Sequence, residues 1–313
     1  MHYRKLGDAG TKVSSVALGG WINYGDGKVA RDAGAAVVRR AYELGINYFD
    51  LADVYAKGTA EEQMGEMLKE YSRHTLVIAT KAFWPMSDEV NDRGLSRKHI
   101  FESIDKSLAR LKTDYVDLYF CHRYDPDVPL EETVRAMDDL VKIGKVLYWG
   151  TSEWSAEQLE AAHALCDRHG YYRPVVEQPQ YSMLVREPVE GQVLPKVEQR
   201  GMGLVVWSPL AQGMLTGKYD DGVPEDSRFA REGWAAERYM TDANAARVRA
   251  LKPLADELGV SRAQLALAWA LRHPRVSSVI IGATRAEQVD DNAAAADLEL
   301  SAETLARIEK ILA

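Results

Sequence analysis

Apolar runs of strand length alternate along the chain with longer segments of helical period. Eight such runs are found, at residues 15–20, 47–52, 75–81, 116–122, 146–152, 175–180, 203–210 and 277–283. Short runs that are apolar on both faces are typical of strands buried in a parallel sheet that helices cover. The pattern therefore predicts eight parallel strands.

The segments between the runs are amphipathic, as at residues 35–45, 96–111, 130–144 and 155–170. The segment 155–170 opens on Ser155 and closes on Gly170, the residue types preferred at the two ends of a helix. Eight strand–helix units favour a closed (β/α)8 TIM barrel in the α/β class. A doubly wound open sheet is the alternative, but the first strand-to-helix turn, GGWINYGDG at 19–27, and the later ones lack the GxGxxG of dinucleotide-binding sheets.

Two further segments have their own pattern. The start, RKLGDAGTKVS at 4–14, predicts a β-hairpin with Gly10 at the turn, ahead of the barrel. Residues 211–242 combine glycine, proline and mixed charge, and so predict a long loop, which in a compact domain is usually functional. No linker separates parts of the chain, so we predict a single domain over residues 1–313.

Composition narrows the class of protein. The chain has 47 acidic and 39 basic residues with no Lys/Arg-rich block, so neither nucleic acid nor an anionic membrane is an expected partner. Two cysteines and the lack of a leader or a long apolar span predict a soluble protein of the cytoplasm without membrane insertion. The seven histidines are scattered without a ligand spacing, so no metal site is expected.

Titratable side chains gather where the predicted strands end. Asp50 and, five residues on, Tyr55 follow the second strand, Lys81 ends the third and His122 ends the fourth. In a barrel these ends form the active-site face. Asp50 and Lys81 are placed to pair, which would hold an ammonium beside Tyr55 and favour its phenolate, while His122 could donate a hydrogen bond to a substrate oxygen. The alternatives are a structural ion pair and a histidine that only packs.

As a set, Asp50, Tyr55, Lys81 and His122 resemble the catalytic tetrad of the aldo-keto reductases. The motifs GLSRKHI, TDYVDLYF, EETVRAM, YWGTSEWS, WSPLA, GKY and SSVIIGA are similar to the voltage-gated potassium channel β-subunit branch of that family. The resemblance implies a (β/α)8 barrel that uses NADPH/NADP+ to reduce a small-molecule carbonyl substrate, an aldehyde or a ketone, with Tyr55 protonating the carbonyl oxygen. It leaves open a homo-tetramer, as in the channel branch, or a monomer.

The same resemblance assigns further residues. Those that would bind the cofactor are Gly20, Trp21, Asp50, Ser152, Gln178, Trp207, Ser208, Leu210, Gln212, Gly213, Lys218, Arg228, Gly282, Thr284, Arg285, Gln288, Asp291 and Asn292. Those that would bind the substrate are Trp21, Tyr55, Trp84 and His122. Apart from the resemblance, four more aromatic residues fall in predicted strand-to-helix loops or at loop ends and are candidates either for an aromatic pocket or for packing: Tyr24, Tyr124, Trp154 and Trp234. One departure is Glu153, where the channel branch carries Arg and many reductases Asn, and where a carboxylate is expected to weaken a contact.

A second function uses the same fold. In the channel branch the barrel is a cofactor-binding regulatory β subunit of a potassium channel with little turnover. Members of that branch have an N-terminal extension and an Asn at the position of His122. Because this sequence has neither, we expect an enzyme, with His122 as the residue that separates the two functions.

Overall fold

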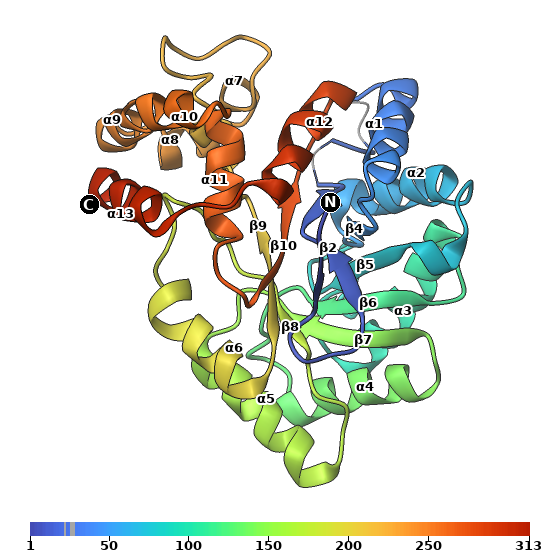
Figure 1. The fold of residues 1–313 in the computed structure, drawn as a ribbon. Coiled ribbons are helices and arrows are strands. Elements are labelled where there is room, and N and C mark those ends of the chain that lie inside the picture. The colour runs from blue at the N-terminus through green and yellow to red at the C-terminus, as the bar shows by residue number, and fades with distance from the viewer. Residues whose placement is uncertain (22, 26–28) are drawn as a thin grey trace.

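Eight parallel strands close into a barrel in the computed structural model, which describes residues 1–21, 23–25 and 29–313 (Figure 1). The strands are β3 (Val16–Gly19), β4 (Tyr48–Asp50), β5 (Val77–Ala82), β6 (Val116–Cys121), β7 (Val146–Thr151), β8 (Val176–Glu177), β9 (Gly203–Trp207) and β10 (Val276–Ile281). They pair in the order β10-β3-β4-β5-β6-β7-β8-β9. Each predicted run overlaps one of these strands, and their closed order confirms the barrel against the open sheet. The glycine-containing turn 19–27 falls partly outside the described residues.

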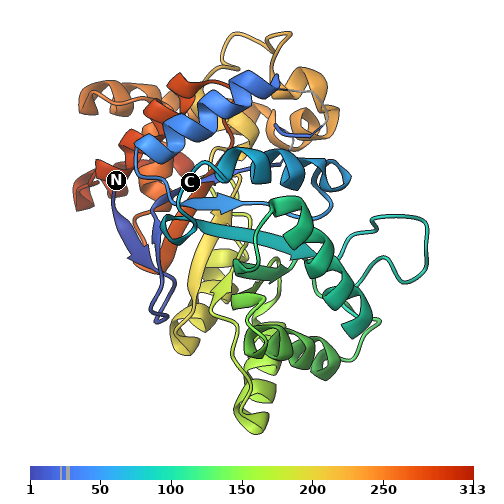
Figure 2. The ribbon, with the colours of Figure 1, turned by 90° about the vertical axis from the view of Figure 1, so that its right-hand side faces the viewer.

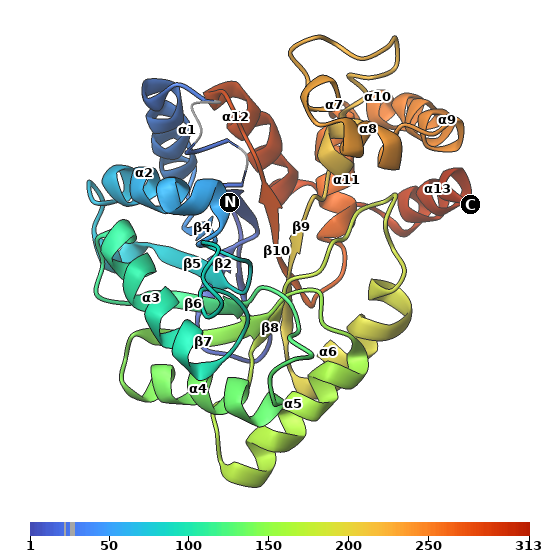
Figure 3. The same ribbon diagram turned by 180° about the vertical axis from the view of Figure 1, so that it is seen from behind.

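Helices surround the barrel, as the view from behind shows (Figure 3). Those that follow the strands or pack beside them are α1 (Arg31–Glu43), α2 (Thr59–Leu68), α3 (Arg97–Leu111), α4 (Leu130–Lys142), α5 (Ala156–His169), α6 (Leu194–Arg200), α11 (Arg262–Ala270), α12 (Ala286–Ala294) and α13 (Ala302–Leu312). The predicted caps of α5 are present: Ser155 and Gln158 satisfy each other's backbone N–H groups, and Gly170 has a φ of 68°.

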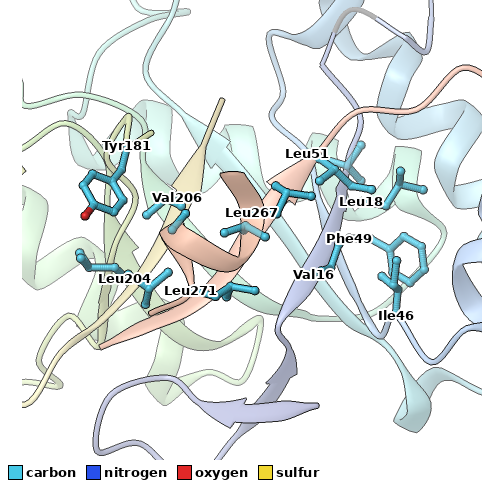
Figure 4. Packing of buried hydrophobic residues seen from close by; sticks show 14 of the residues in the cluster. Val16, Leu18, Ile46, Phe49, Leu51, Tyr181, Leu204, Val206, Leu267 and Leu271 are labelled. Atoms are coloured by element: carbon cyan, nitrogen blue, oxygen red, sulfur yellow. The ribbon is translucent and has the colours of Figure 1, made fainter. Parts of the chain in front are cut away.

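The strands separate two apolar layers. Because successive side chains point to opposite faces, Val16 and Leu18 of β3 pack outward against helices, whereas Ala17 between them belongs to the cluster inside the barrel. Figure 4 shows part of the outer layer, including Leu204 and Val206 of β9. Cys121 lies in the outer layer, and burial raises the pKa of its thiol.

The chain begins with an antiparallel hairpin of β1 (Tyr3–Lys5) and β2 (Lys12–Ser14), as predicted. Gly10 lies in the connection between the two strands, as predicted, and the residue there with a positive φ, of 55°, is Gly7. A Cβ on Gly7 would lie 2.3 Å from the carbonyl oxygen of Gly201, so only glycine fits there. Leu6 and Val13 belong to the inner cluster, so the hairpin covers the amino-terminal end of the barrel.

The prediction of a long loop at 211–242 was wrong in part. The segment contains η4 (Ala211–Thr216), α7 (Arg228–Arg231) and α8 (Gly233–Tyr239), and α9 (Asp242–Ala250) and α10 (Lys252–Leu258) follow. Helices of four to seven residues are too short to give a clear period in the sequence. Other short helical segments are η1 (Tyr55–Gly58), η2 (Arg73–Thr75), η3 (Val189–Val193) and η5 (Ala295–Asp297). No helix of the described residues has the length and apolar content to cross a membrane.

Candidate active site

Three titratable side chains project into the barrel because of their register. Asp50, Lys81 and His122 each come two residues after an inward-facing side chain, those of Tyr48, Ala79 and Phe120 in the inner cluster. All strands run parallel, so these residues meet at the carboxyl end of the barrel. The structure therefore brings together the strand residues that the sequence singled out.

Tyr55 joins them from η1, the turn after β4. Ala56 and Lys57 in this turn have φ values of 48° and 52°, in the left-handed region that non-glycine residues rarely adopt. Asp53 anchors the turn: its backbone N–H donates to the carbonyl of Lys81 at 3.2 Å, and its buried carboxylate accepts a hydrogen bond from Ser103 at 2.8 Å. The turn is thereby tied to β5 and α3.

The Lys81 ammonium connects the set. It is completely buried and donates to Asp50 Oδ2 at 2.7 Å, to the Leu51 carbonyl at 2.5 Å and to Tyr55 Oη at 3.3 Å. Gln178 donates to the other oxygen of Asp50 at 2.8 Å. Burial opposes the charge on Lys81, but the carboxylate of Asp50 and the oxygen of Tyr55 leave its pKa above the usual value. Lys81 is therefore a fixed cation next to a phenol.

The charge of Lys81 favours the phenolate of Tyr55, as expected, but it is not the largest effect on this phenol. Burial raises the pKa of Tyr55 and outweighs the attraction to Lys81, while the charge of Asp50 acts in the same direction as burial. Tyr55 is thus a neutral phenol that can donate a proton. The sequence showed the cation next to the tyrosine but not the loss of solvent around it.

His122 is 8% exposed, and its ring meets that of Tyr55 edge to face at 6.0 Å between centroids. Burial, and then the charges of Lys81 and Arg123, hold the pKa of His122 well below its usual value. The imidazole is therefore neutral and has one N–H to donate. Among the described residues, its Nδ1 has no hydrogen-bond partner.

A cavity of about 970 Å³ opens above these residues. This volume is at the upper end of the range for small-molecule and cofactor sites. Asp50, Tyr55 and His122 line it, and so do all the residues assigned to the cofactor by resemblance except Gly20. Gly20 lies next to the wall, where an added Cβ would meet Leu51 at 2.5 Å, and its predicted role stays a prediction.

One end of the cavity is rich in cations. Lys218 and Arg228 line it, and burial together with nearby cations lowers the pKa of both; no ion pair joins either to a carboxylate within the described part of the chain. Arg228 donates to Gln212 Oε1 at 2.6 Å. Arg285 precedes α12, whose first turn has no side-chain cap. Cations that line a cavity next to an uncapped helix start suit a ligand with phosphate groups.

The other end has aromatic walls. Trp21 lies 6.5 Å from Trp207 and 6.1 Å from Trp234 between ring centroids, and Trp84 meets His122 edge to face at 6.3 Å. Trp84 begins the loop between β5 and α3 that extends from the barrel in Figure 2. Trp21, Trp84 and Trp207 line the cavity. Of the further aromatic candidates, Tyr24, Tyr124, Trp154 and Trp234 are not among its lining residues.

Glu153 has a defined structural role. Its Oε1 accepts a hydrogen bond from Trp207 Nε1 at 2.8 Å and another from the backbone N–H of Gln180 at 2.6 Å. Its φ of 59° turns the chain sharply after Ser152. The carboxylate thus holds the Trp207 indole, a contact that its place in the sequence did not reveal.

Sequence reasoning missed several polar residues of the cavity, among them Asn23 and Arg123. Asn23 is buried and donates to the carbonyl of Ala283 at 3.2 Å. Arg123 also lines the cavity, directly after His122. The position of Arg123 beside a strand-end histidine was a usable signal, whereas Asn23 had none, because its contact spans 260 residues.

The chain is similar to known proteins over nearly its whole length. The model of a family described as the aldo/keto reductase family matches residues 15–313. A probable voltage-gated potassium channel subunit beta of Arabidopsis thaliana is 47% identical over 319 residues, covering 100% of this chain and 97% of the relative. Similar proteins are a probable subunit beta of Oryza sativa subsp. japonica, 45% identical (100% and 97% covered), and a putative one of Schizosaccharomyces pombe, 42% identical (99% and 93% covered).

Proposed function

The chain belongs to the aldo/keto reductase family, and from this membership we propose that it is an NADPH-dependent oxidoreductase that reduces aldehydes or ketones to alcohols. The observation that carries the proposal is the buried Lys81 ammonium between Asp50 Oδ2, at 2.7 Å, and Tyr55 Oη, at 3.3 Å, at the base of the cavity. A phenol in this position can act as a general acid.

The residues supply a proton and stabilise charge. Tyr55 gives its proton to the carbonyl oxygen, and the phenolate that forms lies beside Lys81, whose charge stabilises it. Neutral His122 donates a hydrogen bond to the same oxygen and orients the carbonyl. NADPH, when bound, supplies the hydride that completes the reduction.

Residues of the cavity would hold this cofactor. Ser152 and Gln178 would bind the nicotinamide carboxamide, and Trp207, fixed by Glu153, would stack on the ring. Lys218 and Arg228 would approach the phosphates, and Ser208, Leu210, Gln212 and Gly213 would cover the pyrophosphate. Gly282, Thr284, Arg285, Gln288, Asp291 and Asn292, at the start of α12, would hold the adenosine 2′-phosphate and the adenine. Because the two cofactors differ only in the 2′-phosphate, Arg285 at the uncapped start of α12 supports NADP over NAD.

The test is NADPH oxidation with 4-nitrobenzaldehyde, followed by absorbance. Tyr55→Phe should lower kcat by roughly 100- to 10,000-fold, the usual contribution of a general acid. Tyr115→Phe is the matched control, since Tyr115 packs against Arg73 and does not line the cavity. If Tyr55→Phe still binds NADPH, as measured by tryptophan fluorescence, the loss of kcat concerns the chemical step. Equal rates for Tyr55→Phe and the unaltered protein would exclude this mechanism.

A second candidate function is a cofactor-binding regulatory β subunit of a potassium channel. The full-length relatives named as channel subunits, at 42–47% identity, support it. It predicts a homo-tetramer, measurable by light scattering, and a channel that co-purifies. Tight NADPH binding without turnover of any carbonyl, together with a co-purifying channel, would favour this candidate over the enzyme.

A further inference from the structure

Arg123 is a cation in the catalytic part of the cavity that the proposed mechanism does not use. It follows His122 directly and lines the same cavity as Tyr55 and Trp84. Its guanidinium donates to the carbonyl of His122 at 2.5 Å and lies 5.5 Å from the centroid of the Trp84 ring. These contacts fix the side chain in place and leave N–H groups of the five in a guanidinium for a ligand.

No acidic residue neutralises this cation within the described part of the chain. Among the described residues no ion pair involves Arg123, and the carboxylate of Asp125, two positions on, accepts from the backbone N–H groups of Leu95, at 2.7 Å, and Asp127, at 3.0 Å. The other cation at this end, Lys81, is paired with Asp50. Arg123 therefore gives the substrate end a positive charge that no carboxylate of the described residues pairs with.

The charge lies close enough to act on the reacting groups. It lowers the pKa of Tyr55 and of His122, in each case as a smaller effect than burial. The aromatic rings of Trp21 and Trp84 form walls around the same end of the cavity. The surroundings thus suit a molecule with an apolar body, a carbonyl near Tyr55 and an oxyanion within reach of a guanidinium.

We propose that Arg123 is a specificity-determining residue that binds an oxyanion, a carboxylate or a phosphate, carried by the carbonyl substrate. The preferred substrates are then anionic aldehydes or ketones. This inference rests on the proposed reductase function and adds the class of substrate to it.

The test compares two aldehydes that differ mainly in charge, 4-carboxybenzaldehyde and 4-nitrobenzaldehyde. The unaltered protein should have the higher kcat/KM for the carboxylate. Arg123→Met keeps an apolar stem against Trp84 and should lower the carboxylate-to-nitro ratio of kcat/KM by about 10- to 100-fold, the loss expected for a charge-assisted hydrogen bond. Arg123→Lys should restore part of the ratio. Any effect of the lost charge on Tyr55 applies to both aldehydes and cancels in the ratio.

Arg93→Met is the matched control, because Arg93 is a cation of the loop that begins with Trp84 but does not line the cavity. It should leave the ratio unchanged. The aldehyde 4-formylphenyl phosphate, compared with 4-carboxybenzaldehyde, distinguishes a preference for phosphate from one for carboxylate.

The outcomes separate the inference from the function on which it rests. Tyr55-dependent turnover with the same ratio in Arg123→Met and the unaltered protein would overturn the inference and leave the function standing. Absence of turnover of all three aldehydes would contradict the function. In that case, or if Arg123→Met does not fold, the binding of benzoate and of benzamide to the unaltered protein is measured by tryptophan fluorescence. Binding of benzoate but not of benzamide supports the oxyanion site. Equal binding of both, or binding of neither, contradicts it.

Discussion

Replacement of Glu177 by glutamine tests the energetic consequence of a carboxyl group buried beside the candidate site. Glu177 ends β8 and is fully buried. The Thr151 hydroxyl donates to one of its oxygens, and the backbone N–H of Trp154 donates to the other at 3.2 Å. Burial raises the pKa of Glu177 from 4.5 to about 8. The amide in Glu177→Gln can accept from Trp154 and donate to Thr151, as the protonated carboxyl group can, but it does not titrate.

The sign and size of the effect follow from the two pKa values. Between pH 4.5 and about 8, the folded protein keeps a proton on Glu177 that the unfolded chain has lost. The contribution of this group to the free energy of unfolding therefore falls as pH rises. At about 1.4 kcal/mol for each pH unit, the loss between roughly pH 5.5 and pH 8 is about 3 kcal/mol, reduced near the upper end where the folded protein also begins to lose the proton.

The assay is the thermal midpoint of the unaltered protein and of Glu177→Gln at these two pH values. The difference in free energy of unfolding between the variant and the unaltered protein should shift by about 3 kcal/mol in favour of the variant from the lower to the higher pH. This shift corresponds to several degrees in the thermal midpoint. Glu160→Gln is the control, because Arg200 and Lys196 lower the pKa of Glu160 to about 2, outside this window. A difference between Glu177→Gln and the unaltered protein that is equal at both pH values would refute the reasoning.

Three other changes test the site and the packing. His122→Asn should slow reduction of 4-nitrobenzaldehyde by about tenfold or more while NADPH binding, followed by fluorescence, persists; undiminished turnover would reduce His122 to a packing role. Glu153→Ala removes the acceptor of the Trp207 N–H and should weaken NADPH binding several-fold, measured by calorimetry, whereas Glu153→Gln should bind NADPH nearly as well as the unaltered protein. Equal weakening of NADPH binding in both variants would assign the effect to the charge of Glu153. Gly65→Ala places a Cβ 2.5 Å from a backbone oxygen of α3 and should lower stability by about 1–3 kcal/mol by thermal melting, whereas Gly10→Ala, with open space around it, should not.

The architecture could be predicted from the sequence because its signals are local and repeated. The strands are runs buried on both faces over most of their length, and Ser155 and Gly170 mark the ends of α5. The candidate tetrad followed from the same logic, because residues that end parallel strands must meet at one end of a barrel. The structure brings Asp50 and Tyr55 into contact through Lys81, and the ring of His122 meets that of Tyr55.

Features that depend on distant parts of the chain could not be predicted in this way. The acidity of Tyr55 depends on how much solvent the surrounding residues exclude, which no local pattern records. The hydrogen bond from Trp207 to Glu153 joins residues 54 positions apart. The need for glycine at position 7 arises from the approach of Gly201, far along the chain. Each is a property of the assembled barrel.

The hairpin that covers the amino-terminal end of the barrel also has a kinetic consequence. With Leu6 and Val13 packed into the inner cluster at that end, the two ligands of the proposed reaction share the mouth at the opposite end. A ligand bound deeper in the cavity can then leave only after the outer one has departed. Bisubstrate kinetics should therefore follow a compulsory order of addition and release, and product inhibition patterns would reveal which molecule enters first.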